Sequence, residues 1–346
     1  MTESAGPATL SQVAEHAGVS LATASRALNG SARKVNADLQ ERVLASAAAL
    51  GYSPNLPAQA VARGTSNTVA IVVGDIADPY FSSIASGAIR VADERGLVVT
   101  MSATGGDPQR EAATLAALRG QRPRAVILAG SRHVDAVDDS DSARELAAIE
   151  RLGGQVALVG SPSPGFRSVA VSNREGAAAL ANALIDRGYS DFAILAGAND
   201  LQTARERAAG FAEAARRRGA IIPTARIVHG AFSRDGGYAA MSLLLAAGAR
   251  PSCVFAVTDV MALGAMTSLR DAGVEPGVQV AVAGFDDIPF LRDVAPPLTT
   301  VALPLADIGA RALEIALADE PDAADLAAPF EGVVVLRDST PGIAAP

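Results

Sequence analysis

The sequence predicts an α/β protein in two parts, a small helical unit at the N-terminus and a larger core of parallel β-sheets. Residues 9–50 carry helix-capping signals and turn residues at the spacing of three short helices. From Asn67 onwards, β-branched runs alternate with helical patterns in two successive series, which is typical of parallel sheets covered by helices on both faces. With 346 residues, the chain is long enough for two or three domains.

The N-terminal unit begins with a helix-turn-helix pattern. Thr9 starts a short helix as the first residue of a capping box, and residues 17–19 make a tight turn. Ser20 then caps a second helix over residues 21–28, which the pair at 29–30 ends. This geometry lays the second helix in the major groove of DNA, although a small helical hairpin without a DNA role has the same spacing.

A third helix and a linker complete the N-terminal part. Asn36 caps the third helix, which ends before Gly51. Asn55 and Pro57 fit the start of a further short helix, and Gly64 fits its end. About eight residues are too few for a stable helix in water. This segment is therefore either a plain linker or one that becomes helical only when it docks on DNA and on its dimer mate.

Charge is distributed unevenly along the chain. The formal net charge is −8, which at first argues against a nucleic-acid partner. Residues 1–64 hold five basic and four acidic side chains and carry +1, so the remainder carries −9. Lys34, the only lysine, follows the second helix. Because the segment is only weakly basic, phosphate contacts must come partly from backbone N–H groups, helix N-termini and hydroxyls.

Other classes of protein find little support in the sequence. It contains no apolar run of about 18 residues and no signal-peptide pattern at its N-terminus, so we expect a cytoplasmic protein without a membrane partner. Cys253 is the only cysteine, which excludes an internal disulfide and suits a reducing compartment. His16, His133 and His229 are scattered, and neither a Gly-x-Ser-x-Gly elbow nor a phosphate-binding loop with lysine occurs. We therefore expect no enzyme activity, no metal and no cofactor.

The alternating pattern also predicts where a ligand binds. The expected strands are 68–73, 97–101, 124–129, 155–159, 191–196, 226–228, 252–257 and 278–283. The expected helices are 81–95, 108–119, 143–152, 175–187, 204–218, 235–247 and 260–272. Ligands of parallel sheets bind outside the carboxyl ends of the strands. The candidate loops are therefore 74–82, 129–134, 197–207, 229–234, 257–260 and 284–290.

Several motifs follow one another along nearly the whole chain. They are TLSQVAEHAGVSLATASRALNG, LGYSPN, PNLPAQAVARG, DPYFSSIASGA, ARERAAGF, TDVMALGAM, VAGFDD, PPLTT and LRDST. In this order and spacing, the sequence resembles the LacI/GalR family of transcriptional regulators. The resemblance implies a dimeric repressor or activator that binds a double-stranded DNA operator, with a two-lobed effector-binding core like that of the periplasmic sugar-binding proteins. An exported binding protein would share the core but not the helix-turn-helix unit.

The resemblance also sets the domain boundaries. We expect a helix-turn-helix DNA-binding domain over 1–54, a hinge helix and linker over 55–66, and an effector-binding core over 67–340. The first lobe comprises 67–171 and 303–328, the second comprises 172–300 and 329–340, and crossovers fall near 171–173, 299–303 and 326–331. Because the C-terminus has no leucine heptads, we expect a homodimer without a tetramerising coiled coil.

The resemblance places base reading on Leu21, Ala22 and Arg26. Arg26 can donate two hydrogen bonds to guanine O6 and N7, or bind a phosphate instead, whereas Leu21 and Ala22 offer only apolar contact. Val61 stands where the family usually has a leucine wedge for the minor groove, and Arg63 lies beside it. The other polar side chains expected at DNA, as phosphate contacts or helix caps, are Thr9, Ser20, Thr23, Ser25, Asn29, Lys34 and Asn55.

The resemblance places the effector in a cleft between the lobes. The candidate residues are Asp78, Tyr80, Phe81, Ser82, Ser131, Arg207, Phe232, Thr258 and Asp286. Arg207 is a fork donor in the first turn of its helix, Phe232 is a stacking platform, and Asp286 accepts hydroxyls unless it caps a helix. Tyr80 and Phe81 can instead serve ordinary packing at a helix start.

The composition of the cleft suggests a class of ligand. Carboxylates, one arginine, small hydroxyls and an aromatic face suit a neutral sugar or similar polyol. A purine or an anion remains open, because Arg207 and an aromatic ring can also hold those. Thr258 departs from the family, which usually has asparagine there, and it lacks the donor and acceptor pair of an amide. The sequence does not decide whether the effector releases or promotes DNA binding.

Overall fold

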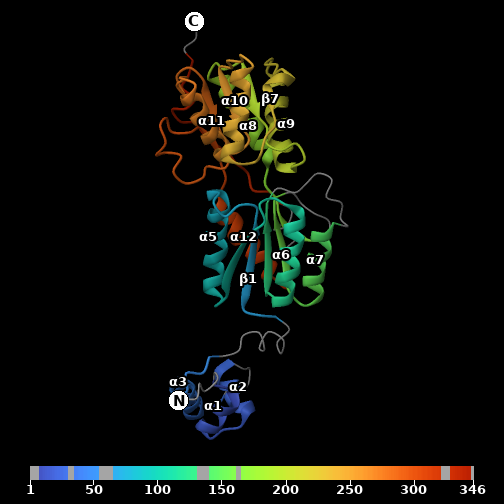
Figure 1. Cartoon of the computed structure of the whole chain (residues 1–346), viewed down its shortest axis with the longest axis vertical. Coiled ribbons are helices and arrows are strands. Elements are labelled where there is room, and N and C mark those ends of the chain that lie inside the picture. The colour runs from blue at the N-terminus through green and yellow to red at the C-terminus, as the bar shows by residue number, and fades with distance from the viewer. Residues whose placement is uncertain are drawn as a thin grey trace, which may run out of the picture. The chain divides into compact units, whose positions relative to one another are not determined.

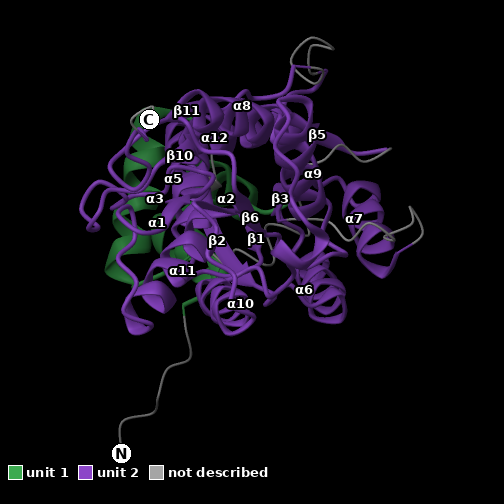
Figure 2. Ribbon diagram, turned by 90° about the horizontal axis from the view of Figure 1, so that it is seen from above, with its two compact units in different colours: residues 1–66 green, residues 67–346 purple. Residues whose placement is uncertain are grey.

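The computed structural model describes residues 8–29, 35–53, 65–130, 140–160, 165–320 and 328–343. The chain divides into two compact units, residues 1–66 and residues 67–346, which are green and purple in Figure 2. The expected hinge helix, with Asn55, Val61 and Arg63, lies outside the described residues, as do Lys34 and Ser131. We describe each unit by itself.

The described part of the first unit is a bundle of three helices with a small core. It comprises α1 (Leu10–Ala17), α2 (Leu21–Asn29) and α3 (Ala37–Ala49). The predicted capping box is confirmed, because Thr9 N donates to Gln12 Oε1 at 2.8 Å and Gln12 N donates to Thr9 Oγ1 at 3.3 Å. The buried apolar side chains are Val13, Ala14, Ala17, Ala24, Ala27, Val43 and Ala47. Five of these seven are alanines, so the unit buries little apolar surface.

The second unit contains a five-stranded parallel sheet in the order β2-β1-β3-β4-β5. Its strands are β1 (Thr68–Val73), β2 (Val98–Ala103), β3 (Ala125–Ala129), β4 (Gln155–Val159) and β5 (Arg167–Val169). Its helices are α5 (Pro79–Glu94), α6 (Pro108–Gln121), α7 (Asp141–Arg151) and α12 (Leu305–Leu317). Alternate residues of β1 join different apolar clusters, Ile71 the one with α5 and α12 and Val72 the one with α6 and α7. The two helix pairs therefore cover opposite faces of the sheet (Figure 1).

A second parallel sheet of the same unit has the order β7-β6-β8-β9. Its strands are β6 (Phe192–Leu195), β7 (Ile227–Val228), β8 (Cys253–Ala256) and β9 (Ala281–Ala283). The helices around it are α8 (Asn173–Asp186), α9 (Gln202–Arg217), α10 (Arg234–Ala246) and α11 (Asp259–Asp271), with the short 3-10 helix η1 (Thr224–Arg226) before β7. Cys253, at the start of β8, is fully buried.

Segments between the two sheets pair with one another. β10 (Thr300–Ala302) pairs antiparallel with β11 (Val333–Val335), and Val171 forms a parallel bridge with Phe330. Residues near 171, 301 and 333 therefore run side by side, which is the arrangement of a two-lobed core whose chain crosses between lobes.

The predicted α/β architecture is confirmed, and some elements differ from the prediction. The predicted strand 278–283 begins only at Ala281, because Gly277 has φ +81° and its N–H donates to Val280 O in a turn. Helix α12 and the short strands β5, β10 and β11 were not among the predicted elements. Among the helices that the structure describes, none is both long enough and apolar enough to cross a membrane.

Candidate functional site

Helix α2 presents its start to solvent. Thr23 N donates to Ser20 Oγ at 3.1 Å, so Ser20 caps the helix as its position predicts. Leu21 is 51% exposed and Ala22 is also exposed, while Ala24 and Ala27 are buried on the opposite side. Leu21 and Ala22 can therefore contact a partner while α2 keeps its helical conformation.

Arg26 lies along α2 in this structure. Its Nε donates to Ala22 O at 2.9 Å, one turn back along the helix. This contact uses Nε. The two Nη atoms can still donate the pair of hydrogen bonds that the guanine edge accepts. The side chain of Asn29 lies outside the described part of the chain.

Two polar contacts join helix α3 to α1. Arg42 of α3 donates from Nη2 to Ala17 O, the last carbonyl of α1, at 2.5 Å. His16 Nδ1 lies 3.0 Å from Ser46 Oγ on α3. Polar contacts thus support the small alanine-rich core beneath the turn between the first two helices.

The second candidate site centres on Arg207, which is only 2% exposed. The predicted helix start at 204 is corrected to Gln202, so Arg207 lies in the second turn of α9 rather than the first. Its Nε donates to Asn173 Oδ1 and its Nη1 donates to Val257 O, both at 2.9 Å. The ring of Phe285 covers the guanidinium at 3.9 Å, a cation–π contact. Neighbouring Arg205 is exposed, as expected.

Asp286 completes a buried charge pair with this arginine. Arg207 Nη2 lies 2.9 Å from Asp286 Oδ1, and both side chains are almost inaccessible to solvent. Burial raises the pKa of Asp286 well above its ordinary value, although the positive charge of Arg207 lowers it. The backbone of Asp286 has φ +123° and does not cap a helix, which corrects the alternative considered from the sequence.

A second buried carboxylate holds the loop that carries Asp286. Asp259, at the start of α11, accepts hydrogen bonds from Thr300 Oγ1 at 2.6 Å and from Ile288 N at 3.0 Å. Burial raises the pKa of Asp259 to about 7, although these hydrogen bonds favour its charged form. Residue 284 must be glycine, because a Cβ there would lie 2.2 Å from Asp259 Oδ1.

The N-terminus of α5 brings first-lobe residues to the same cluster. Asp78 caps α5 by accepting from Tyr80 N at 2.9 Å, and burial raises the pKa of its carboxyl. Burial and the negative charge of Asp286 raise the pKa of the Tyr80 hydroxyl, so α5 and the Arg207–Asp286 pair interact electrostatically. The rings of Tyr80 and Phe81 meet edge to face at 5.1 Å. Ser82 is exposed, and its hydroxyl donates to Pro79 O at 3.1 Å.

Phe232 and Thr258 have local structural partners. Thr258 is 3% exposed and caps α11, where Met261 N donates to its Oγ1 at 3.3 Å. Phe232 is half-buried over Gly197, where a Cβ would lie 2.7 Å from the ring. Thr258 therefore has a capping role, while Phe232 keeps part of its ring accessible.

Sequence analysis missed three contributors to this site. Asn173, Phe285 and Thr300 contact the charged cluster and are nearly or fully buried. Asn173 also donates to Glu206 Oε2 at 3.1 Å, which continues the polar network along α9. Phe285 lies two residues after β9 and Thr300 begins β10, so both lie near strand ends, where residues of an α/β core are candidates for a site, whereas Asn173 begins α8.

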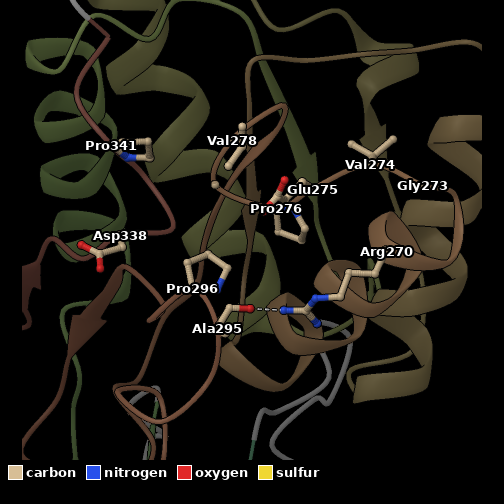
Figure 3. A pocket seen from close by; sticks show the side chains of 11 residues that line it. Arg270, Gly273, Val274, Glu275, Pro276, Val278, Ala295, Pro296, Asp338 and Pro341 are labelled. Carbon is tan, nitrogen blue, oxygen red and sulfur yellow. Dashed lines mark hydrogen bonds between the residues drawn. The ribbon is translucent and has the colours of Figure 1, made fainter.

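A pocket of about 700 Å³ lies at the opposite end of α11. It is lined by residues 270, 273–278, 295–296, 338 and 341, none of which was predicted to bind a ligand. Figure 3 shows the guanidinium of Arg270 pointing to Ala295, to whose carbonyl oxygen it donates a hydrogen bond. Its charged side chains, Arg270, Glu275 and Asp338, are exposed, so the buried polar cluster at Arg207 is the stronger candidate site. No group of metal-binding side chains occurs in the ranges that the structure describes.

A helix-turn-helix unit joined to a two-sheet core with a buried polar cluster at its strand ends defines the class of ligand-controlled transcriptional regulators. Residues 9–55 match the model of bacterial regulatory proteins of the lacI family, and residues 181–340 match a periplasmic binding protein-like domain. The transcriptional regulator GalS of Salmonella typhimurium is 34% identical over 89% of each chain, and GalR of Escherichia coli is 31% identical over 98% of each.

Solved structures agree with this classification. The lac repressor dimer bound to operator and the anti-inducer ONPF superposes with a TM-score of 0.79 at 27% identity, covering 97% of this chain and 99% of that one. The transcriptional regulator CelR in complex with cellobiose gives a TM-score of 0.68 at 28% identity, covering 96% and 99%. The chain belongs to the LacI family of helix-turn-helix transcriptional regulators.

Proposed function

We propose that this regulator represses transcription in the cytoplasm by binding a two-fold symmetric operator as a homodimer, and that a small polar ligand in the core controls it. A sugar or related polyol is the proposed class of ligand, and no chemical turnover is involved. The relatives support this proposal, since one structural neighbour is a dimer on its operator and another holds cellobiose. The observation that carries it is the joint presence of an exposed reading helix and a buried charge pair at the strand ends.

The proposed DNA contacts are those of α2. Leu21 and Ala22 contribute apolar contacts to base edges, and Arg26 reads a guanine after its Nη atoms turn toward the groove. Ser20 and Thr23 cap the helix and supply hydroxyls to phosphates. Outside the described residues, Val61 is the proposed minor-groove wedge and Arg63 its basic neighbour.

The proposed ligand contacts are acceptors and an aromatic surface. Asp286 and Asp78 accept ligand hydroxyls, Phe232 stacks against the ring, and Arg207 holds Asp286 in place. The charges of Asp286, Arg207 and Asp78 affect the pKa of the Tyr80 hydroxyl. Tyr80 is therefore the proposed hydrogen-bond donor from the first lobe. Ligand binding thereby joins α5 of the first lobe to α9 and the 284–290 loop of the second.

The backbone of Asp286 offers a route from the ligand to the crossover segments. Its N–H donates to Val301 O at 2.8 Å, and Leu303 N donates to its carbonyl at 3.2 Å. Leu303 directly precedes the segment that enters α12, so a shift of Asp286 moves the connection between lobes. We propose that closure of the cleft rotates the first lobes within the dimer and changes the spacing of the two 55–66 segments on DNA.

The domain boundaries belong to the same proposal. The helix-turn-helix domain ends near residue 54, residues 55–66 form the hinge, and the core begins at 67. Limited proteolysis of the free protein should cut first within 55–66 and leave the core intact. The same cuts should become slower on operator DNA, whereas equal rates with and without DNA would count against a hinge that folds on binding.

The function is tested by selecting a duplex from random sequence and measuring binding by fluorescence anisotropy. The selected site should be palindromic, and affinity should fall steeply with salt because phosphate counterions are released. A screen of sugars, polyols and nucleobases should find a ligand that changes operator affinity and is recovered unchanged. A protein that binds no duplex better than random DNA, or that converts its ligand, would refute the proposal.

A further inference from the structure

The loop that carries Asp286 has an unusual backbone. Asp286, Asp287 and Phe290 have φ values of +123°, +55° and +76°, and they are three of the four non-glycine residues with positive φ in the described part of the chain. L-amino acids rarely adopt these values, and a loop keeps them only where surrounding contacts impose them. The contacts that hold residues 285–290 therefore determine where the carboxylate of Asp286 lies.

Arg337 supplies one of these contacts from a distant part of the chain. Its Nη2 lies 2.7 Å from Asp287 Oδ1, and its Nη1 donates to Leu298 O at 2.7 Å. The side chains of Arg337 and Asp287 are 9% and 22% exposed, so water screens their attraction less than it screens a surface ion pair. One guanidinium thus joins the loop to the segment that leads into β10.

Arg337 is also bound to the strands that pair between the two sheets. It lies two residues after β11, its N–H donates to Thr299 Oγ1 at 2.7 Å, and Thr299 Oγ1 donates to Arg337 O at 3.1 Å. Asp286 and Asp287 are adjacent in the chain, yet they pair with arginines from different elements. These arginines are Arg207 of α9 and Arg337 after β11. A change at either arginine therefore alters the backbone that both carboxylates share.

We propose that Arg337 is a positioning residue for the proposed ligand site. Through its ion pair with Asp287, it holds the backbone of Asp286 in the strained conformation and links that backbone to β10 and β11. This inference rests on the proposed function and adds a regulatory contact to the same site. Without the ion pair, the loop can relax toward ordinary φ values, so fewer molecules hold Asp286 in this position. Ligand affinity and the coupling between the ligand site and operator binding should then both decrease.

The positioning role is tested on the free full-length protein by hydrogen exchange of the peptide 285–290. Arg337→Gln should accelerate exchange in this peptide by about 10-fold, the size of a typical pairwise coupling, and leave β6 and β8 unchanged. Arg292→Gln, at an exposed position close to the same loop, removes the same charge and should change nothing. Unchanged exchange in Arg337→Gln, or acceleration that extends equally to β6 and β8, would overturn the proposal.

A double-mutant cycle separates the ion pair from the other contacts of Arg337. Asp287→Asn is compatible with the positive φ, and it provides a measurement if Arg337→Gln does not fold. Asp287→Asn should accelerate exchange by about 10-fold on its own, and Arg337→Gln should add little in its presence. Asp293→Asn, at an exposed position, is the control for the lost carboxylate. Additive effects of the two substitutions would show that Arg337 acts only through Leu298 O and would overturn the proposal.

Coupling to DNA is tested with the selected operator duplex as the probe, because coupling between two sites is reciprocal. Operator binding should change the exchange of peptide 285–290 in the natural protein, and Arg337→Gln should lose most of this change. Equal exchange with and without the duplex in the natural protein would overturn the coupling through Arg337. Failure to bind any duplex would instead refute the proposed function, and the comparison on the free protein would still decide the positioning role.

Discussion

The helix-turn-helix unit and the core differ in what supports their sites. Among the described residues of the first unit, the buried apolar side chains are five alanines and two valines, and the reading helix exposes Leu21. The second sheet instead packs Phe192, Phe211 and Phe255 together, with ring centroids 5.4 Å and 4.5 Å apart. The exposed site thus rests on a thin core, whereas the buried site lies in a unit with a large aromatic and aliphatic interior.

Substitution of Arg207 should have the largest effect on the difference in stability between the two units. Arg207→Ala leaves Asp286 as a buried carboxylate without its cation, which should destabilise the core by about 3–5 kcal/mol. The transition of the helix-turn-helix unit should be unchanged. Denaturant unfolding followed by hydrogen exchange resolves the two units, and Arg205→Ala, at an exposed position of the same helix, should change stability by less than about 0.5 kcal/mol. Equal effects at 205 and 207 would show that the charge pair does not hold the core.

A core substitution in the first unit sharpens the same contrast. Val13 is fully buried, and Val13→Ala should cost about 2 kcal/mol. Since the unit has little apolar surface to lose, this change should unfold much of it without DNA while the core keeps its melting temperature. Excess operator DNA should restore the helical signal in circular dichroism. A unit that stays folded in the free variant would mean that its alanine core is more stable than its burial indicates.

Arg26→Ala tests the reading helix without disturbing its core. It should weaken operator binding by about 1–3 kcal/mol and relax the preference at one base pair in each half-site. Binding is measured on duplexes with that base pair replaced, and Arg90→Ala on α5, whose side chain is 58% exposed, is the matched loss of one positive charge. A uniform loss across all duplexes would instead identify Arg26 as a phosphate contact.

The pH dependence of stability tests the raised pKa of a buried carboxyl in the core. Folding raises the pKa of Asp259 from its ordinary 3.8 to about 7, so the folded core retains a proton that the unfolded chain releases in this range. Stability from this group is therefore full below about pH 4 and declines as the pH rises to about 7. Asp259→Asn imitates the neutral form and should flatten the decline, whereas Asp271→Asn at the other end of α11 should not. An unchanged slope in Asp259→Asn would contradict the assignment.

The smallest expected effect concerns the wedge, which lies outside the described residues. Valine is shorter than leucine and is branched at Cβ, so it should open a base step less fully. Val61→Leu should increase the bend of operator DNA and tighten binding a few-fold, as measured by gel phasing and anisotropy. Equal bend angles and equal affinities for the two proteins would remove Val61 as a point of difference from the family.

Local sequence signals were sufficient for most of the elements but not for the partners of Arg207 in the charged cluster. The strand Thr68–Val73 and the capping box at Thr9 follow from neighbouring residues alone. Helix α12 was missed, and the structure shows no side-chain cap at Pro304 to mark its start. The partners of Arg207 lie 34 and 50 residues away, at Asn173 and Val257, so no local pattern could indicate that its donors are already engaged. The positive φ of Asp286 likewise depends on tertiary contacts.

Cys253 has a practical consequence for studying these motions. It is the only cysteine, it is fully buried in β8, and burial raises the pKa of its thiol, which keeps it in the unreactive protonated form. A cysteine introduced at an exposed position therefore becomes the single reactive thiol without removal of the natural one. Fluorescent or spin labels placed in this way on α2, α5 and α9 can report distances between the DNA-reading helix and each lobe in an otherwise unaltered protein.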